Sequence, residues 1–225
     1  MNKVIASLLL ALMAAPLAAQ TSGDIPKLVV GITVDQLRTD YLQMMQHLFS
    51  EKGFKRLMNE GLMYENVTFD FPKPDRASAT ASIYTGTYPS YNGIPSNTLY
   101  NITRKRVESV LFDISKMGNY TDETVSAQNL LTSTVSDELK IASDGFSAVY
   151  SIAPTFEQAI LSAGHAANSA FWFNEANGKW ATSTYYNDIP AYIDVANREN
   201  SLSERIDTLS WQPYYRFPDI RGCLI

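Results

Sequence analysis

A chain of 225 residues, 45% of them hydrophobic, is long enough to bury a core, either as one globular domain or as part of a larger one. Its formal net charge of −5 argues against nucleic acid as a partner, because binding to phosphates needs an excess of lysine and arginine. The only cysteine, Cys223, cannot support an intramolecular disulfide framework.

The first 20 residues have the pattern of a secretory signal peptide. Lys3 precedes an apolar run that is short for a membrane span, Pro16 interrupts the end of that run, and small residues follow up to Ala19. We predict cleavage near Ala19 and export of residues 21–225 to the periplasm or the extracellular medium, with no integral membrane segment left. The mature chain has a net charge of −6, because cleavage removes Lys3 and no acidic residue. An uncleaved N-terminal anchor is the alternative.

A run of mostly β-branched and apolar residues spans positions 27–35 and ends in an acid. Such a run predicts a buried parallel strand with Asp35 at its carboxyl end, which is the edge where open α/β sheets bind ligands. The pattern then predicts a helix with Thr39 as its N-cap, a short second helix that ends at Gly61, and a strand toward Phe69.

The segment PDRASATASIYTG, residues 74–86, has the pattern of a loop that enters a helix. Asp75 is a suitable N-cap, small residues follow, and Gly86 is a suitable end. The first turn of a helix attracts anions through its free N–H groups and its dipole. The pattern by itself therefore predicts either an anion site near Arg76 or a tightly packed helix face.

The middle of the chain alternates polar stretches with periodic ones and contains no internal repeat. Residues 100–125 lack a clear period and predict a loop or an insertion. Residues 126–145 predict a helix with Ser126 as its cap and Gly145 at its end. Residues 146–153 predict the next strand of the core.

The last part of the chain contains one strong local signal. Asn177 and Gly178 lie between two aromatic runs, which predicts a β-hairpin. Residues 187–225 match no recognisable unit, and we assign residues 170–217 to a cap hairpin and tail. The predicted fold class is therefore α/β, with a mostly parallel central sheet flanked by helices and an inserted cap subdomain.

Five sequence blocks, in order, resemble the alkaline phosphatase superfamily: LVVGITVDQLRTDYL, GFKRLMNEGLMYEN, SIYTGTYPSYNGIPSNTLY, LLTSTVSDELK and ILSAGHAANSAFWF. They are most similar to its secreted phosphate-irrepressible branch and to the related phosphodiesterases. The resemblance runs from residue 27 to about residue 217 and corresponds to the N-terminal part of the family fold. It implies hydrolysis of phosphate mono- or diesters with two zinc ions.

The resemblance also implies roles for particular positions. Asp35 matches the acid at the end of the first strand, which binds one zinc ion. The nucleophilic Thr or Ser of the family lies nine residues before the Thr of a TG pair, and counting back from Thr85 leads to Arg76. Asn97 matches an asparagine that holds the phosphate.

Two further positions depart from the family pattern. Thr155 and Glu157 stand where the phosphomonoesterase branch has a lysine and an arginine that bind the phosphate. A guanidinium at Arg76 stays protonated and cannot act as the nucleophile, and Glu157 would repel a phosphate dianion. Ser78 and Thr80 point in other directions from the same helix and do not replace the lost hydroxyl. We therefore expect Arg76 and Glu157 to form an ion pair across the former phosphate pocket.

The zinc site is also incomplete in this sequence. The family completes it with a DxxxH motif, an Asp-His pair and a late His, whereas this chain has only His47 and His165. We expect no complete two-zinc site and a structural role for His165.

Three functional alternatives follow from the resemblance and these departures. The first is a secreted family member without catalysis, whose candidate ligand is a phosphate-containing or other anionic small molecule. The second is the N-terminal part of a working zinc-dependent phosphatase or phosphodiesterase. The third is a truncated remnant without function.

Overall fold

The computed structural model describes residues 26–186, 189–199 and 209–212. The chain divides into two units, residues 1–33 and residues 34–225. The predicted signal peptide, residues 1–20, and Cys223 lie outside the described residues. Within the three described ranges, no helix is long and apolar enough to cross a membrane.

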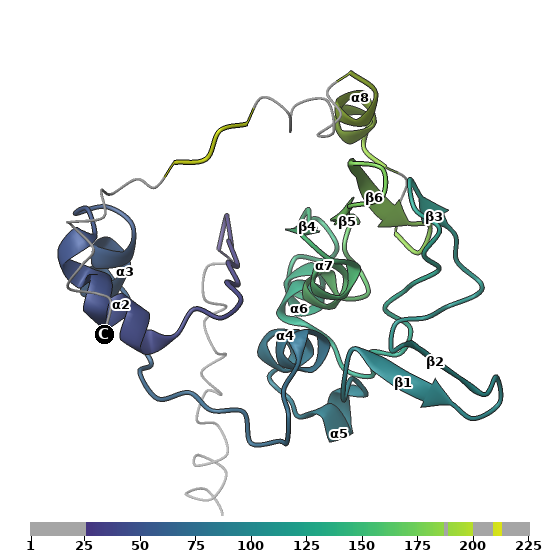
Figure 1. Ribbon diagram of the computed structural model, residues 1–225, viewed down its shortest axis with the longest axis horizontal. Helices are drawn as coiled ribbons and strands as arrows, with labels where there is room; N and C mark the ends of the chain where they lie inside the picture. Colours follow the sequence, from purple (N-terminus) through teal and green to yellow (C-terminus); the bar gives the residue numbers. More distant parts are fainter. Residues whose placement is uncertain (1–25, 187–188, 200–208, 213–225) are drawn as a thin grey trace, which may run out of the picture. The chain divides into compact units, whose positions relative to one another are not determined.

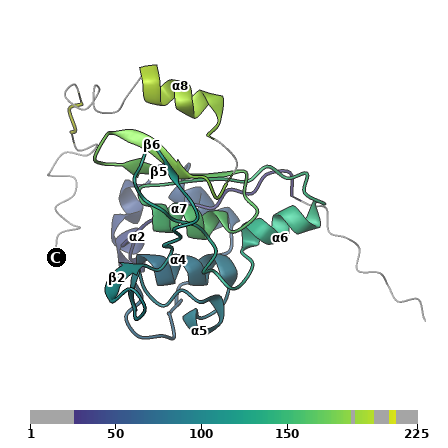
Figure 2. The same cartoon turned by 90° about the vertical axis from the view of Figure 1, so that its right-hand side faces the viewer.

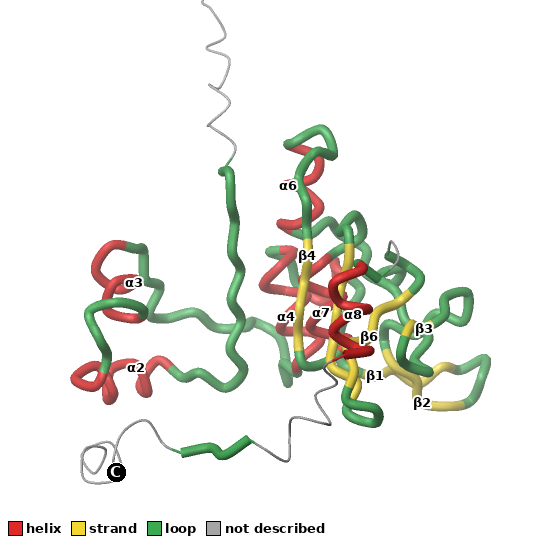
Figure 3. The backbone as a smooth tube through the Cα atoms, turned by 90° about the horizontal axis from the view of Figure 1, so that it is seen from above, coloured by secondary structure: helices red, strands yellow, loops and turns green. Residues whose placement is uncertain are grey.

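The strand predicted for residues 27–35 is not formed. Figure 3 shows the described part of this segment as loop, and its apolar side chains are exposed, with Leu28 and Ile32 at 80%. The prediction was wrong here because a strand needs a neighbouring strand to accept and donate its backbone hydrogen bonds, and no described strand pairs with this segment.

Two short helices follow, α2 (Thr39–Met45), which continues as a 3-10 turn (Gln46–Leu48), and α3 (Phe54–Glu60). Thr39 is the first helical residue of α2 and not its cap, because Arg38 occupies the N-cap position. Gly61 ends α3, as predicted. The strand predicted toward Phe69 is absent, and that stretch is loop.

The larger of the two described sheets is a four-stranded mixed sheet in the second unit (Figure 1). Its order is β3 (Gly118–Asn119), β6 (Lys179–Ser183), β5 (Ser169–Asn174) and β4 (Tyr150–Ala153). Only the β4–β5 pair is parallel, so the α/β class is confirmed while the described sheet is less parallel than predicted. The predicted hairpin is confirmed, since β5 and β6 are antiparallel and meet at a turn that includes Asn177 and Gly178.

Two helices lie in layers on one side of this sheet. Helix α7 (Phe156–Ala163) packs against β4 and β5, and α4 (Arg76–Thr85) packs against α7 on the side away from the strands, as Figures 1 and 2 show. Small or branched side chains let the two helices pack closely. The fully buried apolar side chains on these helices are Ala77, Ala81, Ala159, Ile160, Leu161 and Ala163.

The segment predicted as loop or insertion contains regular structure. Strands β1 (Thr98–Asn101) and β2 (Arg106–Ser109) form an antiparallel hairpin after the short helix α5 (Pro89–Asn92). The burial pattern of these strands is mostly exposed, so the hairpin lacks the alternation of apolar and polar residues on which a sequence prediction depends.

The helix predicted over residues 126–145 is less than half as long in the structure. Helix α6 covers Val135–Ala142, with Thr134 and not Ser126 as its cap. Residues 126–134 leave the helical path because Ser126 Oγ donates to Asp113 and the Leu131 N–H donates to the Asn92 carbonyl.

The tail contains a helix that the pattern did not predict, α8 (Ala191–Glu199). Asn197, 2% exposed, attaches α8 to β6, because its amide accepts from the Trp180 N–H and donates to the Trp180 carbonyl, both at 2.8 Å. The side chain thus replaces a strand neighbour at this edge, which is a tertiary contact that local sequence does not reveal.

Candidate functional site

The N-terminus of α4 is closed by its own cap. The Asp75 carboxylate accepts the Ser78 N–H at 3.0 Å, and Ser78 Oγ accepts the Asp75 N–H at 2.9 Å. Such a reciprocal capping box is the local reason that the helix begins at Arg76. The C-terminal end is equally conventional, since Gly86 has a left-handed backbone with φ of 66°. The helix and both its end signals are confirmed as predicted.

Asn97 reaches this helix end from outside it. Its Oδ1 accepts the Ala77 N–H at 2.8 Å, and its own N–H donates to Asp75 Oδ2 at 2.6 Å. The N–H groups of Ala77 and Ser78 are therefore satisfied within the chain. An anion at this helix end would have to displace those contacts, so the phosphate cradle suggested by the pattern is occupied by protein atoms.

Arg76 makes its ion pair with Asp35. Its Nε lies 3.2 Å from Asp35 Oδ2, and Gln158 of α7 donates from Nε2 to the other carboxylate oxygen at 2.9 Å. Both oxygens of Asp35 thus have protein partners. Arg76 and Asp35 are each a little under half exposed, so water screens the pair.

The expected pair of Arg76 with Glu157 is not formed. Among the described residues, Asp35 is the acid within ion-pair distance of Arg76. The prediction failed because two positions that the resemblance assigns to one pocket do not have to face each other. Thr155 is the N-cap residue of α7, and Glu157 lies in the first turn of that helix, half-buried.

Glu123 is a partly buried carboxylate whose charge interacts with that of Glu157. Burial raises the pKa of Glu123 above its usual value, hydrogen bonds from Trp172 and Thr121 oppose that rise, and the negative charge of Glu157 adds to it. Glu157 therefore lies near a second carboxylate, which makes this region electrostatically unsuited to a phosphate dianion. The polar stretch around residue 123 contains no motif that could have revealed it.

The two candidate replacement hydroxyls of α4 are buried and engaged. Ser78 is 0% exposed and belongs to the capping box, while Thr80 is 4% exposed and donates from Oγ1 to the Arg76 carbonyl at 2.7 Å. Neither is open to a substrate.

The described residues do not fit two zinc ions. No group of three or more His, Cys, Asp or Glu side chains that could hold a metal ion occurs in the described ranges. Asp35, the position that the resemblance assigns to a zinc ligand, already contacts a guanidinium and an amide. A structural zinc ion takes four ligands and a catalytic one takes three, so this arrangement cannot supply either.

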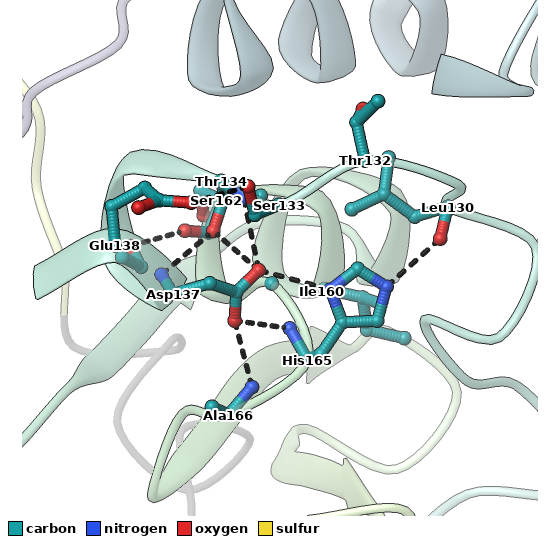
Figure 4. A network of polar contacts seen from close by, with 12 residues as sticks. Leu130, Thr132, Ser133, Thr134, Asp137, Glu138, Ile160, Ser162, His165 and Ala166 are labelled. Carbon is teal, nitrogen blue, oxygen red and sulfur yellow. Dashed lines mark hydrogen bonds and ion pairs between the residues drawn. The ribbon is translucent and has the colours of Figure 1, made fainter. Parts of the chain in front are cut away.

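His165 takes part in a separate polar network (Figure 4). Its Nδ1 lies 2.9 Å from Asp137 Oδ2, and its Nε2 lies 2.8 Å from the Leu130 carbonyl oxygen. This agrees with the structural role expected for His165. The network joins α6 to the turn between α7 and β5, and neither Asp35 nor Arg76 takes part in it.

An open cavity of about 570 Å³ lies beside α8 and β3. Asp194 on its wall accepts the Tyr120 hydroxyl at 2.6 Å and pairs with Arg198 at 2.7 Å, so its carboxylate is already engaged. None of the predicted site residues lines this cavity, whose lining is Asn119, Tyr120, Ile189, Ala191 and Asp194.

Comparisons with known proteins agree on the relationship. The model of the type I phosphodiesterase / nucleotide pyrophosphatase family matches residues 29–215. A protein of Myroides odoratus named calcium-transporting ATPase is 40% identical over 80% of this chain and 33% of its own length. Alkaline phosphatase PhoV of Synechococcus elongatus is 35% identical over 84% of this chain and 35% of its own. Alkaline phosphatase PafA of Elizabethkingia meningoseptica is 35% identical over 82% of this chain and 35% of its own.

The fold agrees with the sequence relationship. The crystal structure of alkaline phosphatase PafA superposes with a TM-score of 0.80 at 32% identity, over 88% of this chain and 39% of that one. This chain therefore spans about a third of the length of the curated relatives that it matches. With a family model over most of its residues, the chain belongs to the type I phosphodiesterase / nucleotide pyrophosphatase family of the alkaline phosphatase superfamily and corresponds to the N-terminal portion of that fold.

Proposed function

We propose that this chain is an exported family member that does not hydrolyse phosphate esters with the residues it carries. The observation behind the proposal is the contact between Arg76 and Asp35. It puts a guanidinium and carboxylate pair where the resemblance expects a nucleophilic hydroxyl beside a metal ligand. A protonated guanidinium cannot attack phosphorus, and a carboxylate that is already paired is a poor metal ligand.

The spacing of substitutions in a relative supports the assignment of these positions. A crystallised PafA variant is changed at a threonine and an asparagine 21 positions apart, and at a lysine and an arginine two positions apart. Arg76 and Asn97 are also 21 positions apart, and Thr155 and Glu157 are two apart. Of these four positions, only Asn97 carries the residue type found in PafA, and its side chain caps α4.

The same contacts limit what the site could bind. A phosphate-containing or other anionic small molecule is the candidate ligand, and it would have to displace Asp35 from Arg76. Glu157, in the first turn of α7, opposes it by charge. We therefore propose that any such binding is weak and falls further at high salt.

A hydrolysis assay tests the proposal. We would measure turnover of p-nitrophenyl phosphate and bis-p-nitrophenyl phosphate by the full chain with added zinc, beside Arg76→Thr and the control Arg56→Thr. Arg56 is also exposed and pairs with Glu60 at 2.8 Å on α3. We expect no turnover above a heat-treated sample and less than about one zinc ion per chain. Zinc-dependent turnover that Arg76→Thr changes and Arg56→Thr does not would overturn the proposal.

Export is a separate part of the proposal and rests on the pattern of residues 1–20. Mass spectrometry of the chain recovered outside the cytoplasm should show an N-terminus near residue 20. An intact Met1 on chain that stays with the membrane would support the anchor instead.

A further inference from the structure

His165 lies between two hydrogen-bond acceptors. One is the Asp137 carboxylate at 2.9 Å from Nδ1, and the other is the Leu130 carbonyl at 2.8 Å from Nε2 (Figure 4). A carbonyl oxygen has no proton to donate, and neither has an ionised carboxylate. A neutral imidazole has a single N–H and can satisfy only one of the two. Both contacts are hydrogen bonds only when the ring carries two protons.

Asp137 is held in its ionised form by its other partners. Its side chain is 6% exposed, and Oδ1 accepts the N–H groups of both His165 and Ala166 at 2.8 Å. Oδ2 accepts from the N–H and the hydroxyl of Thr134 at 2.9 and 3.0 Å. Burial alone would raise the pKa of Asp137, but these hydrogen bonds and the one from His165 outweigh it and hold that pKa far below its usual range. A buried ionised carboxylate is stabilised further by a cation beside it, because a buried charge is costly when it is unpaired.

The packing leaves little freedom around this pair. Gly164 has φ of 74°, and a Cβ atom there would lie 2.5 Å from Asp137 Oδ2, so only glycine lets the turn approach the cap of α6. The buried Tyr186 donates its hydroxyl to the Gly164 carbonyl at 2.7 Å and holds the turn from the other side. The ring of His165 therefore has a defined place between its two acceptors.

We infer that His165 is an imidazolium in the folded chain and acts as a pH-sensitive clamp, which joins residues 130–134, helix α6 and the turn between α7 and β5, and which loosens as the pH rises. Loss of the proton from Nε2 would place its lone pair against the Leu130 carbonyl, and loss from Nδ1 would leave the buried carboxylate without its counter-charge.

The sign of the effect follows from the groups that face the ring. The hydrogen bond to Asp137 raises the pKa of His165, partial burial opposes this, and the bond to the Leu130 carbonyl adds to it. Tyr185 and Tyr186 face the same pair, and burial raises the pKa of both phenols, so they stay neutral at moderate pH. The clamp thus contributes fully below the usual histidine pKa of about 6.5 and is lost as the pH rises through the raised pKa of the folded state.

Nuclear magnetic resonance of the folded full chain tests the charge directly. The sequence contains two histidines, so the His47→Gln variant assigns their ring signals. We expect the His165 ring to titrate with a midpoint above about 6.5 and to show two protonated ring nitrogens at neutral pH. A midpoint at or below that value, or a single protonated nitrogen at pH 6, would overturn the inference.

Thermal unfolding across pH tests the mechanical consequence. Between pH 6 and pH 9, we expect the Tm of the wild-type chain and of the matched control His47→Gln to fall by about 2–4 °C more than that of His165→Gln. Equal pH slopes for all three proteins would contradict a clamp. Neither measurement involves Arg76 or a phosphate ester, so its result is independent of the proposed function.

Discussion

Asp35 and Asp137 both connect separate segments of the chain, but Asp35 is partly exposed and Asp137 is buried. Asp35 joins the segment before α2 to Arg76 of α4 and Gln158 of α7 with two side-chain contacts, and it is nearly half exposed. Asp137 accepts five hydrogen bonds, three from the turn after α7 and two from Thr134 at the start of α6, and its side chain is almost fully buried. Both tie together segments that are far apart in the sequence.

The difference between the two shows what burial adds to a hydrogen-bonded charge. Around Asp35, water competes for each partner and screens the charge, so removing one partner leaves the others solvated. Around Asp137, whose side chain is 6% exposed, a lost contact leaves a carboxylate oxygen with little access to water. The same residue type is therefore expected to be weakly stabilising at position 35, to which the resemblance assigns zinc binding, and strongly stabilising at position 137.

Asp137→Asn should give the largest loss of stability. The new amide nitrogen would face the N–H groups of His165 and Ala166 or of Thr134, so donors would oppose donors in a buried place. We expect the free energy of unfolding to fall by about 3 kcal/mol, measured by urea denaturation at pH 7.

The exposed Asp122 provides the matched control for this change, and Asp122→Asn should alter the unfolding free energy by less than about 0.5 kcal/mol. Equal effects of the two substitutions would remove the contrast between buried and exposed carboxylates.

Asn97→Ala should have an intermediate effect. The substitution removes the acceptor of the Ala77 N–H at the start of α4 but leaves the capping box of Asp75 and Ser78 in place. A lost cap contact of this kind typically costs about 1 kcal/mol, which we expect from denaturation of the variant. A loss as large as that of Asp137→Asn would mean that Asn97 carries more of the site than its single side-chain contact indicates.

Arg76→Ala should have the smallest effect on stability. Its ion pair with Asp35 is partly exposed, so the unfolding free energy should change by less than about 1 kcal/mol, and the difference from wild type should shrink further in 1 M salt. Arg56→Ala, which breaks the exposed pair with Glu60, is the control of the same chemistry. A loss above about 2 kcal/mol for Arg76→Ala alone would show that the site is organised around this arginine.

The elements that the sequence predicted well are those whose signals are local. The N-cap Asp75 and Gly86 at the end of α4 both belong to one helix, and the turn at Asn177 and Gly178 lies between two strands that pair with each other. The α/β class and the family relationship follow in the same way, since they depend on ordered blocks and not on any single contact.

The predictions that failed depended on distant partners. Residues 27–35 have the composition of a core strand, but no described strand supplies hydrogen bonds to them. The helix expected from residue 126 begins only at residue 135. The preceding segment is not helical because Leu131 and Ser126 donate hydrogen bonds to the Asn92 carbonyl and the Asp113 carboxylate. Helix α8 is attached to β6 by two hydrogen bonds between the Asn197 amide and Trp180. The periodicity of the sequence does not predict this contact.

The same distinction between local signals and distant partners applies to the candidate site. The sequence by itself determined that position 76 has no nucleophilic hydroxyl and that this chain has two histidines, because residue types are known without the fold. Only the tertiary structure decided that Arg76 pairs with Asp35 and not with Glu157, and that His165 lies between two acceptors. Partner choice depends on distances between segments far apart in the chain, and those distances are set by how the helices and strands pack.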